Sequence, residues 1–483
     1  MFTVFTENKN NVSPPIFLLN SETQKKELFE SLKKGVVRMY ACGPTVYDHI
    51  HIGNLRSYLV PDLLHRLFLY CGYTVQLTIN VTDFGHLTDD GDAGEDKIMK
   101  GMQKKGYAVT LQNMRIFTEP YIESFKHDLL SFGNLPPTQL TRASDFVTQQ
   151  IKLIETLVEK EYAYETSDGV YFDIKRFPRY GAIGNIDVTA LKSGARIETN
   201  PEKRNPADFA LWKKGDLGWE SKWGLGFPGW HIECTAMAFA TLGKQLDIHT
   251  GGEDLMHTHH NGELAQAEAI TGKQFVRYWL HNAHITVNST KISKSEGNGI
   301  RLADIIAKGF SPADYRYWLL TSHYRTPSNF SFEALTSAQQ ALLRLKRFVY
   351  EEHADVRATT VNETYEIKFL EAISDDLDTP KAVAILWELI KDTNTPVASK
   401  LATIHSFDSL LSLGLSKSVQ EGQEELGLIS ITEVPTEVQE LLTAREKARA
   451  NKNWNEADTL RDKISEHGYQ LEDTDTGPRI THR

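Results

Sequence analysis

Short apolar runs alternate with longer amphipathic segments along the chain. The runs Val36–Ala41 and Thr74–Val81 are rich in β-branched and large apolar residues, which is typical of buried strands. Between them, residues 55–70 place apolar side chains at helical spacing and predict a helix. Pro61 falls inside that helix, so we expect a kink there or a later helix start. Two more runs have a strand-like composition: 246–250 and 283–287.

This alternation predicts an α/β fold with a Rossmann-like parallel sheet, whose site should lie at the carboxyl ends of the strands. A long segment, about 100–223, interrupts the pattern. Helical periodicity returns after residues 315–324 and is clear over 364–391. From Val438 onward the chain is rich in Ala, Lys, Glu and Arg. We therefore expect a C-terminal α-helical region.

Composition narrows the class of protein. The chain has 483 residues, 40% of them hydrophobic and 24% charged, which suits a globular protein of two or three domains. No window of 18 uncharged apolar residues occurs, and the first residues lack a basic region followed by an apolar run. We therefore expect a cytoplasmic protein without a membrane segment.

The formal net charge of −11 argues against a surface that binds nucleic acid everywhere. A local track of Lys and Arg is enough to bind a phosphate backbone, so RNA binding stays open. Residues 344–347 and 445–452 are candidate tracks. A solvated helix face explains both stretches equally well.

A candidate phosphate-binding turn lies between the first predicted strand and the helix, where His51, Gly53 and Asn54 stand close together. A helix N-terminus presents unpaired N–H groups and the positive end of the helix dipole. Gly53 would let a base or ribose approach the backbone, and the side chains of His51 and Asn54 can donate hydrogen bonds. An ordinary turn would also fit this short motif.

A second candidate element is a Ser/Gly-rich segment that places Lys291 and Lys294 three residues apart. Their ammonium groups could neutralise charge that builds on a pentacoordinate α-phosphate and on a pyrophosphate leaving group. A solvated lysine loop is the commoner explanation of such a segment alone. The order of the histidine and lysine motifs in one chain favours a single nucleotide site with ATP chemistry at a carboxylate.

The chain has three cysteines, Cys42, Cys71 and Cys234, which are too few and too widely spaced for a disulfide framework. Cys71 suits a small buried residue at a helix end. The other two, with His259 and Glu263 at positions i and i+4, offer the donors of a four-ligand zinc site. The alternative is two buried cysteines and a surface His/Glu pair, because the sequence has no Cys-x-x-Cys motif of the kind that is typical of a zinc site.

The two phosphate-handling motifs and the residues around them resemble class I aminoacyl-tRNA synthetases, and among these the cysteinyl-tRNA synthetases. The resemblance covers almost the whole chain. It is carried by residues 40–48, 80–83, 203–213, 228–234 and 251–255, and by His259 with His260.

The resemblance implies that Cys42, Cys234, His259 and Glu263 bind one Zn²⁺ that selects the thiolate of substrate cysteine. The hydroxyl of serine is a far poorer zinc ligand, so no editing domain is expected. Neighbouring histidines on a helix point in different directions, and we therefore treat His260, like His257, as a bystander.

The resemblance also implies roles around the adenylate. Gly43, Thr82 and Trp230 match the cysteine pocket, and Asp254 matches a position near the adenosine and the substrate ammonium group. ATP would bring Mg²⁺ on its phosphates. The residues implied in ATP binding are His51, Gly53, Asn54, Asp254, Lys291 and Lys294, and those implied in catalysis are His51, Asn54, Lys291 and Lys294.

The implied activity is that of a cysteine–tRNA ligase, which activates L-cysteine with ATP and transfers it to the 3′ end of tRNA(Cys), acting as a monomer. The implied catalytic domain covers 1–345, with a connective insertion at about 100–223 and a lysine-loop and connecting region at about 285–345. A helical bundle would follow at 346–435, and a tail that binds the anticodon end of the tRNA at 436–483.

Several positions depart from the family pattern. An acidic, Gly-rich insertion at 84–94 is either a surface loop or a metal or tRNA contact through Asp89, Asp90 and Asp92. Asn54 stands where many class I enzymes have histidine. Gly262 lies inside the predicted metal-binding helix, where glycine costs about 1 kcal/mol relative to alanine. The C-terminus lacks an expected aromatic residue.

Two rival functions remain open. A related ligase could pass the activated cysteine to a small amine, although such ligases typically lack the C-terminal helical region. A paralogue without catalysis could bind only tRNA, but this would require broken catalytic motifs, and the motifs here are intact.

Overall fold

The computed structural model of the chain describes residues 14–85, 96–187, 200–287, 290–291, 299–429, 433–474 and 477–482. One sheet has five strands in the order β11-β10-β3-β4-β5, and each neighbouring pair is parallel. The predicted parallel α/β sheet is therefore confirmed. Its strands are β3 (Val36–Ala41), β4 (Thr74–Val81), β5 (Gln139–Arg142), β10 (Leu246–Gly252) and β11 (Val276–Asn282).

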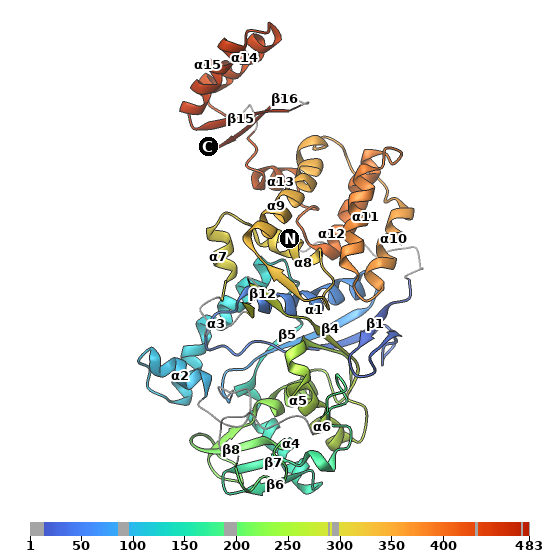
Figure 1. Cartoon of the computed structure of the whole chain (residues 1–483), viewed down its shortest axis with the longest axis vertical. Coiled ribbons are helices and arrows are strands. Elements are labelled where there is room, and N and C mark those ends of the chain that lie inside the picture. Colours follow the sequence, from blue (N-terminus) through green and yellow to red (C-terminus); the bar gives the residue numbers. More distant parts are fainter. Residues whose placement is uncertain are drawn as a thin grey trace. The chain divides into compact units, whose positions relative to one another are not determined.

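Helix α1 (Ile52–Tyr70) lies on one face of this sheet, and α5 (Trp230–Thr241) and α6 (His259–Thr271) lie on the other (Figure 1). Strands covered on both faces are expected to be almost continuously apolar. Strand β3 fits this pattern except at Arg38, whereas β4 alternates polar and apolar residues and buries the polar Thr78 and Asn80. Helix α1 begins at Ile52 and continues through Pro61, so the predicted later start is wrong.

The predicted strand at 283–287 exists in part, but it does not belong to the main parallel sheet. The chain leaves the sheet after β11 because the N–H of Ala283 donates to the carbonyl oxygen of Tyr324 instead of to a sheet neighbour. Residues Ile285–Val287 form β12, which pairs with β13 (Thr290–Lys291) and β14 (Ser328–Phe330) in a separate small sheet. Strand β10 pairs with β3 on one side and with β11 on the other, and the sequence patterns did not identify β11.

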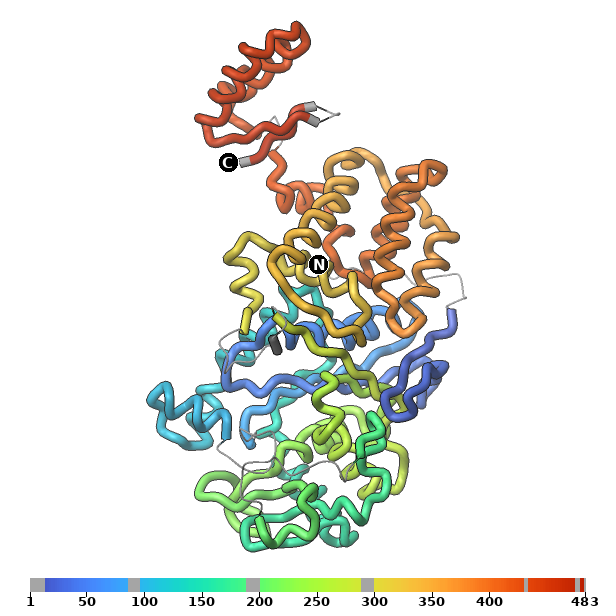
Figure 2. The backbone as a smooth tube through the Cα atoms, viewed as in Figure 1, coloured from blue at the N-terminus to red at the C-terminus, as the bar shows by residue number. Residues whose placement is uncertain are grey.

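The segment between β4 and α5 contains a four-stranded antiparallel sheet in the order β6-β7-β8-β9. Figure 2 shows this part of the chain, in green, on the same side of the parallel sheet as α5 and α6. Strand β5 also falls within residues 100–223, yet it pairs with β4 in the parallel sheet. The elements of this segment are α2 (Lys97–Lys104), α3 (Leu111–Ser131), α4 (Val147–Glu159), β6 (Ala163–Thr166), β7 (Gly169–Phe172), β8 (Phe209–Trp219) and β9 (Gly226–Pro228).

The helical pattern over 364–391 corresponds to two helices, α10 (Glu363–Ser374) and α11 (Thr379–Lys391). A sharp turn separates them, in which Asp376 and Leu377 both have positive φ angles, 60° and 55°. The Asp376 carboxylate is buried and accepts hydrogen bonds from the Leu19 N–H and the Tyr324 hydroxyl, which holds the turn in place.

The chain divides into two compact units, 1–335 with 367–385 and 336–366 with 386–483. Within the second unit, α14 (Thr436–Ala450), α15 (Trp454–Glu466) and the hairpin of β15 (Tyr469–Thr474) and β16 (Gly477–His482) share their own apolar core. The helical periodicity of the sequence did not predict this hairpin. The remaining elements are β1 (Phe17–Asn20), β2 (Lys25–Leu28), α7 (Leu302–Ala307), α8 (Pro312–Leu320), α9 (Phe332–Arg347), α12 (Val397–Leu411) and α13 (Val419–Glu425).

Both candidate basic tracks contain side chains that are held in ion pairs. Arg445 is 2% exposed and donates to both carboxylate oxygens of Asp473, and Arg449 pairs with the same carboxylate. Lys346 is buried against Glu425 at 2.8 Å. These groups therefore serve the second unit's own structure. Among the described helices, none is both long and apolar enough to span a membrane.

Candidate active site and metal centre

The N-terminus of α1 is closed by a reciprocal pair of hydrogen bonds between His51 and Asn54. The Asn54 N–H donates to His51 Nδ1 at 3.3 Å, and the His51 N–H donates to Asn54 Oδ1 at 3.1 Å. Nδ1 therefore acts as an acceptor, and the neutral ring carries its proton on Nε2, where it can be donated. Asn54 thus supports the helix start through its oxygen and keeps its NH₂ group as a donor.

This arrangement suits an anion. Positive helix-dipole charge and main-chain N–H groups concentrate at the first turn, and Gly53 is the second residue of that turn. The structure thus brings His51, Gly53 and Asn54 together at one helix end, at the carboxyl edge of β3. Asp254 follows β10, the strand beside β3, so it lies at the same edge of the sheet.

The lysine motif is only partly described. Lys291 ends the short strand β13, and its backbone partner in β12 is Thr286. Lys294 lies outside the described residues, as does most of the acidic insertion, including Asp89, Asp90 and Asp92.

Four side chains from three distant segments meet in a buried cluster. Cys42 follows β3, Cys234 lies in α5, and His259 and Glu263 lie one turn apart in α6. His259 Nε2 is 3.4 Å from Cys234 Sγ and 3.2 Å from Glu263 Oε1, and Cys42 Sγ is 4.0 Å from Cys234 Sγ. All four donor atoms lie within 4.8 Å of one another. The alternative of a surface His/Glu pair is excluded, because Glu263 is 0% exposed.

Close packing of two helices makes this cluster possible. A Cβ atom at Gly262 would lie 3.2 Å from the His231 side chain of α5, so glycine allows α6 to approach α5 closely. His231 Nδ1 is 3.1 Å from His259 Nδ1, which turns His259 Nε2 toward Cys234 and Glu263. The helix-propensity cost of Gly262 therefore has a packing reason.

Charge in the cluster favours a cation. Burial tends to raise the pKa of Glu263, but the interactions with His249, and then those with His259, outweigh it and lower that pKa to about 2. Burial also opposes ionisation of Cys234, yet hydrogen bonds with Cys42 and His259 bring its pKa to about 6. The thiolate of Cys234 raises the pKa of His259 against the effect of burial. A divalent cation would replace the proton on His259.

Two sulfurs, one imidazole nitrogen and one carboxylate oxygen fit the ligand preferences of Zn²⁺. A second set shares two of these residues: Cys42 and Glu263 with His249 and His260. His260 was treated above as a bystander, but its Nε2 lies 3.3 Å from Cys42 Sγ and its Nδ1 lies 2.7 Å from His281 Nε2. Burial and the neighbouring histidines lower the pKa of His260, so it stays neutral.

The predicted pocket residues border this cluster. The Trp230 ring packs against His259 with centroids 4.3 Å apart, and Thr82, directly after β4, is buried. The Gly43 N–H is taken by Asn80 Oδ1 at 2.8 Å, and a Cβ at Gly43 would overlap the Asn80 carbonyl oxygen. Glycine at position 43 is therefore required by the close approach of the two strand ends, whether or not its backbone meets a substrate.

One acidic residue beside the pocket was not identified from the sequence. Glu233 is 1% exposed, and its Oε1 accepts a 2.7 Å hydrogen bond from the Thr82 hydroxyl. Burial, and then the charge of Cys234, raise the pKa of Glu233 well above its usual value. The only available signal was its place between His231 and Cys234 in the sequence, and no local pattern distinguishes it from a surface glutamate.

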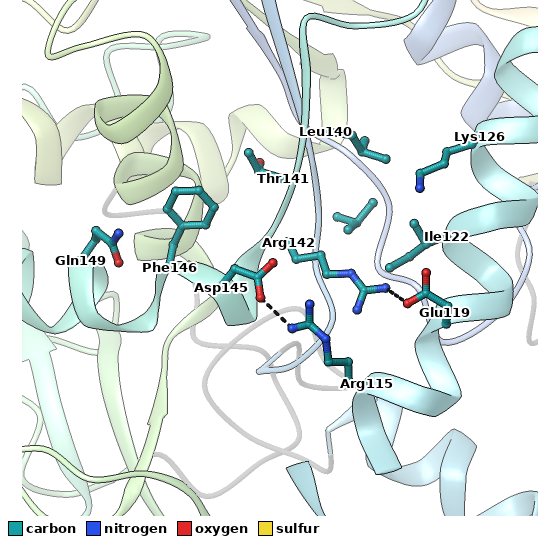
Figure 3. A pocket seen from close by; sticks show the side chains of 11 residues that line it. Arg115, Glu119, Ile122, Lys126, Leu140, Thr141, Arg142, Asp145, Phe146 and Gln149 are labelled. Carbon is teal, nitrogen blue, oxygen red and sulfur yellow. Dashed lines mark hydrogen bonds and ion pairs between the residues drawn. The ribbon is translucent and has the colours of Figure 1, made fainter. Parts of the chain in front are cut away.

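A separate cavity of about 580 Å³ lies beside the edge strand β5 (Figure 3). Two ion pairs border it, Arg115 with Asp145 and Arg142 with Glu119. None of the predicted site residues lines this cavity. Its lining residues are Val81, Arg115, Glu119, Ile122, Lys126, Leu140, Thr141, Arg142, Asp145, Phe146 and Gln149.

Comparison with known proteins first defines the class. Residues 28–340 match the model of the tRNA synthetases class I (C) catalytic domain, 368–414 match the DALR domain, and 432–479 match the cysteinyl-tRNA ligase anticodon binding domain. Among solved structures, methionyl-tRNA synthetase of Mycobacterium tuberculosis in complex with methionyl-adenylate superposes with a TM-score of 0.54. It has 13% identity and covers 83% of this chain and 94% of its own, so it supports the fold alone.

Full-length relatives define the family. The cysteine–tRNA ligase 1 of Burkholderia lata is 41% identical over 96% of this chain and 97% of its own length. The cysteine–tRNA ligase of Treponema denticola is 39% identical over 94% and 97%, and that of Chlorobaculum tepidum is 39% identical over 96% and 98%. The chain belongs to the cysteine–tRNA ligase family.

Proposed function

We propose that this protein is a cysteine–tRNA ligase that uses ATP to attach L-cysteine to tRNA(Cys). The main support is the buried Cys/His/Glu cluster at the carboxyl edge of a class I synthetase fold, in a chain whose full-length relatives bear this activity in their names. In the first step, a carboxylate oxygen of cysteine attacks the α-phosphorus of ATP. The bond from that phosphorus to the β-phosphate bridge breaks, which yields cysteinyl-adenylate and pyrophosphate.

The protein contributes positioning and charge to this step rather than a nucleophile. His51 would donate through Nε2, and Asn54 through its NH₂ group, to phosphate oxygens at the start of α1. Gly53 would leave room for the nucleotide, and Asp254 would contact the adenosine side. Lys291 and Lys294 would neutralise charge on the α-phosphate and on the leaving pyrophosphate, with Mg²⁺ carried by ATP.

Cys42, Cys234, His259 and Glu263 would hold the zinc ion, and Thr82, Trp230 and the backbone at Gly43 would surround the amino acid. A bound Zn²⁺ supplies a Lewis acid that favours a thiolate over a hydroxyl as an added ligand. The Trp230 and His259 rings pack against each other at an interplanar angle of 35°, so the pocket wall and the metal ligand orient each other. Selection of cysteine against serine would follow without an editing site.

In the second step, a terminal ribose hydroxyl of the tRNA attacks the carbonyl carbon of the adenylate, and AMP leaves with the electrons of the broken bond. The hydroxyl proton passes to the departing phosphate or to solvent. We propose that 1–345 carries both steps, that 346–435 forms the helical bundle, and that 436–483 binds the anticodon end. The DALR and anticodon-binding matches support tRNA rather than a small amine as the acceptor. We further propose a monomer, which light scattering would test.

Cysteine-dependent exchange between ATP and pyrophosphate, measured on protein of known zinc content, tests the proposal. We expect exchange with cysteine but not with serine, followed by charging of tRNA(Cys). Exchange without charging would indicate a small-amine ligase instead, and folded, zinc-loaded protein without exchange would reject the ligase activity.

A further inference from the structure

Arg56, in the second turn of α1, is a buried cation bound by main-chain oxygens. It is 2% exposed, and its Nη2 donates to the carbonyl oxygens of Thr326, Tyr324 and His323 at 2.5, 3.1 and 3.0 Å. Its Nη1 donates to the carbonyl oxygen of His284 at 3.3 Å. The guanidinium of Arg56 thus connects α1 to two other segments of the chain, one at His284 and one at 323–326.

His284 is the residue immediately before β12. Strand β12 pairs with β13, which ends at Lys291, and we call this pair the Lys291 hairpin. The peptide of His284 is held from both sides, because its N–H donates to Glu253 Oε1 at 2.9 Å and its carbonyl accepts from Arg56. The hairpin therefore starts from a point attached both to α1 and to the turn that carries Asp254.

The chain that follows the lysine motif is also attached to α1. The N–H of Ile52, the first residue of the helix, donates to the carbonyl oxygen of Ile300 at 2.8 Å. The carbonyl oxygen of Ile52 accepts a 2.9 Å hydrogen bond from the hydroxyl of Tyr315, which is 0% exposed. Contacts of α1 thus hold the chain on both sides of the motif, next to His51.

We propose that Arg56 and Tyr315 are positioning residues for ATP activation, which set the Lys291 hairpin in register with His51 and Asn54. The inference rests on the proposed function, because it assumes that Lys291 and His51 act on the same triphosphate. A displacement of about 1 Å between reacting groups can cost about 100-fold in rate. A planar guanidinium can bridge carbonyls of two segments, whereas a lysine ammonium is a point charge on a flexible stem.

The test is Arg56→Lys, with Arg66→Lys as the matched control. Arg66 lies on the same helix and is also buried, but it pairs with Asp62 and the Gly133 carbonyl. We expect Arg56→Lys to lower kcat for pyrophosphate exchange at least about tenfold and to raise the KM for ATP, since these depend on the placement of phosphate-binding groups. The KM for cysteine and the zinc content should stay within about twofold of wild type.

The control separates positioning from general stability. Arg66→Lys should lower the melting temperature without changing the ratio of the two KM values. If Arg56→Lys and Arg66→Lys alter the KM for ATP, the KM for cysteine and kcat equally, the inference is wrong. If wild-type protein shows no cysteine-dependent exchange, the proposed function fails and the inference falls with it.

Tyr315→Phe gives a second route if Arg56→Lys does not fold. It removes one hydroxyl and leaves the ring in place, so it tests only the hydrogen bond to Ile52. We expect a threefold to tenfold loss of exchange kcat, about the effect of one buried hydrogen bond, with the KM for cysteine unchanged. Exchange by Tyr315→Phe that equals wild type would overturn the role of this residue.

Discussion

At the scale of single residues, the chemistry depends on side chains whose environment changes their protonation. In the metal cluster, burial would by itself keep cysteine protonated and histidine neutral. The contacts of Cys234 with Cys42 and with His259 oppose this effect of burial. The pKa of Cys234 is lowered to about 6, and the pKa of His259 is raised. Because a proton on His259 competes with the metal, zinc affinity should rise with increasing pH.

The two overlapping ligand sets give a residue-scale prediction. We expect Cys234→Ser to lose zinc on dialysis, because it removes one of the two sulfur donors of the proposed set. His260→Asn should keep one zinc per chain, since removal of a neighbour of the ligands costs at most about 100-fold in affinity. Metal analysis by atomic emission measures both. Zinc retained in Cys234→Ser and lost from His260→Asn would assign the metal to the second set.

At the scale of elements, helix α1 connects the parts of the site. Its N-terminus carries His51 and Asn54, its second turn carries Arg56, and its third turn carries Asp62. The Asp62 carboxylate accepts from Arg66 at 3.0 Å and from Arg316 of α8 at 2.5 Å, and all three side chains are buried. Burial alone would raise the pKa of Asp62, but the two guanidinium groups lower it. The helix is thereby fixed against α8.

Asp62→Asn should lower the free energy of unfolding by about 3 to 5 kcal/mol at pH 7, because it leaves two buried guanidinium groups without their anion. A carboxyl group whose pKa is lowered on folding stabilises the protein above its unfolded pKa, about 4. The difference between wild type and variant should therefore be complete at pH 7 and shrink as the pH falls below about 4. Urea unfolding at several pH values measures it.

Asp145→Asn is the control, because Asp145 belongs to an exposed ion pair with Arg115. An exposed pair contributes at most about 1 kcal/mol, so this variant should unfold near the wild-type urea concentration. Equal effects of the two substitutions would show that the buried triad does not anchor α1.

At the scale of the whole molecule, the final part of the chain has an apolar core separate from that of the parallel sheet. Val438, Leu442 and Ile464 pack with Leu471 and Ile480 within 433–482. Its most buried arginine, Arg445, serves an internal ion pair. With a net charge of −11 over the whole chain, tRNA binding must depend on local surfaces and should weaken with salt.

Truncation after Gly427 should therefore impair the transfer of cysteine to tRNA while leaving the activation of cysteine with ATP intact. The truncated protein should catalyse cysteine-dependent pyrophosphate exchange at a rate within about twofold of that of the full chain. The residues proposed to bind phosphate and zinc all precede residue 427. Charging of tRNA(Cys) should fall at least about tenfold in kcat/KM, which corresponds to about 1.4 kcal/mol of lost binding. Equal loss of both activities would show that this region also supports the catalytic unit.

The sequence by itself determined the features that depend on local periodicity and local motifs. The boundaries of Val36–Ala41 and Thr74–Val81, the helix after His51 and the family all follow from patterns that neighbouring residues carry. Strand β5 was not predicted, because a strand of four mostly half-exposed residues gives little periodic signal in the sequence. Residues 283–287 were assigned to the wrong sheet, because pairing depends on distant partners such as Tyr324.

The family resemblance implied the four zinc ligands, but only the tertiary structure gives the physical reason that their side chains meet. Cys42, Cys234 and Glu263 come from separate elements, and their approach depends on the parallel order of β3 and β10 and on the contact of Gly262 with His231. The roles of His260, Glu233 and Arg56 have the same origin, because a buried polar side chain finds partners far away in the chain. Local sequence encodes the elements, whereas the burial that shifts a pKa or requires a hydrogen bond exists only after the elements pack.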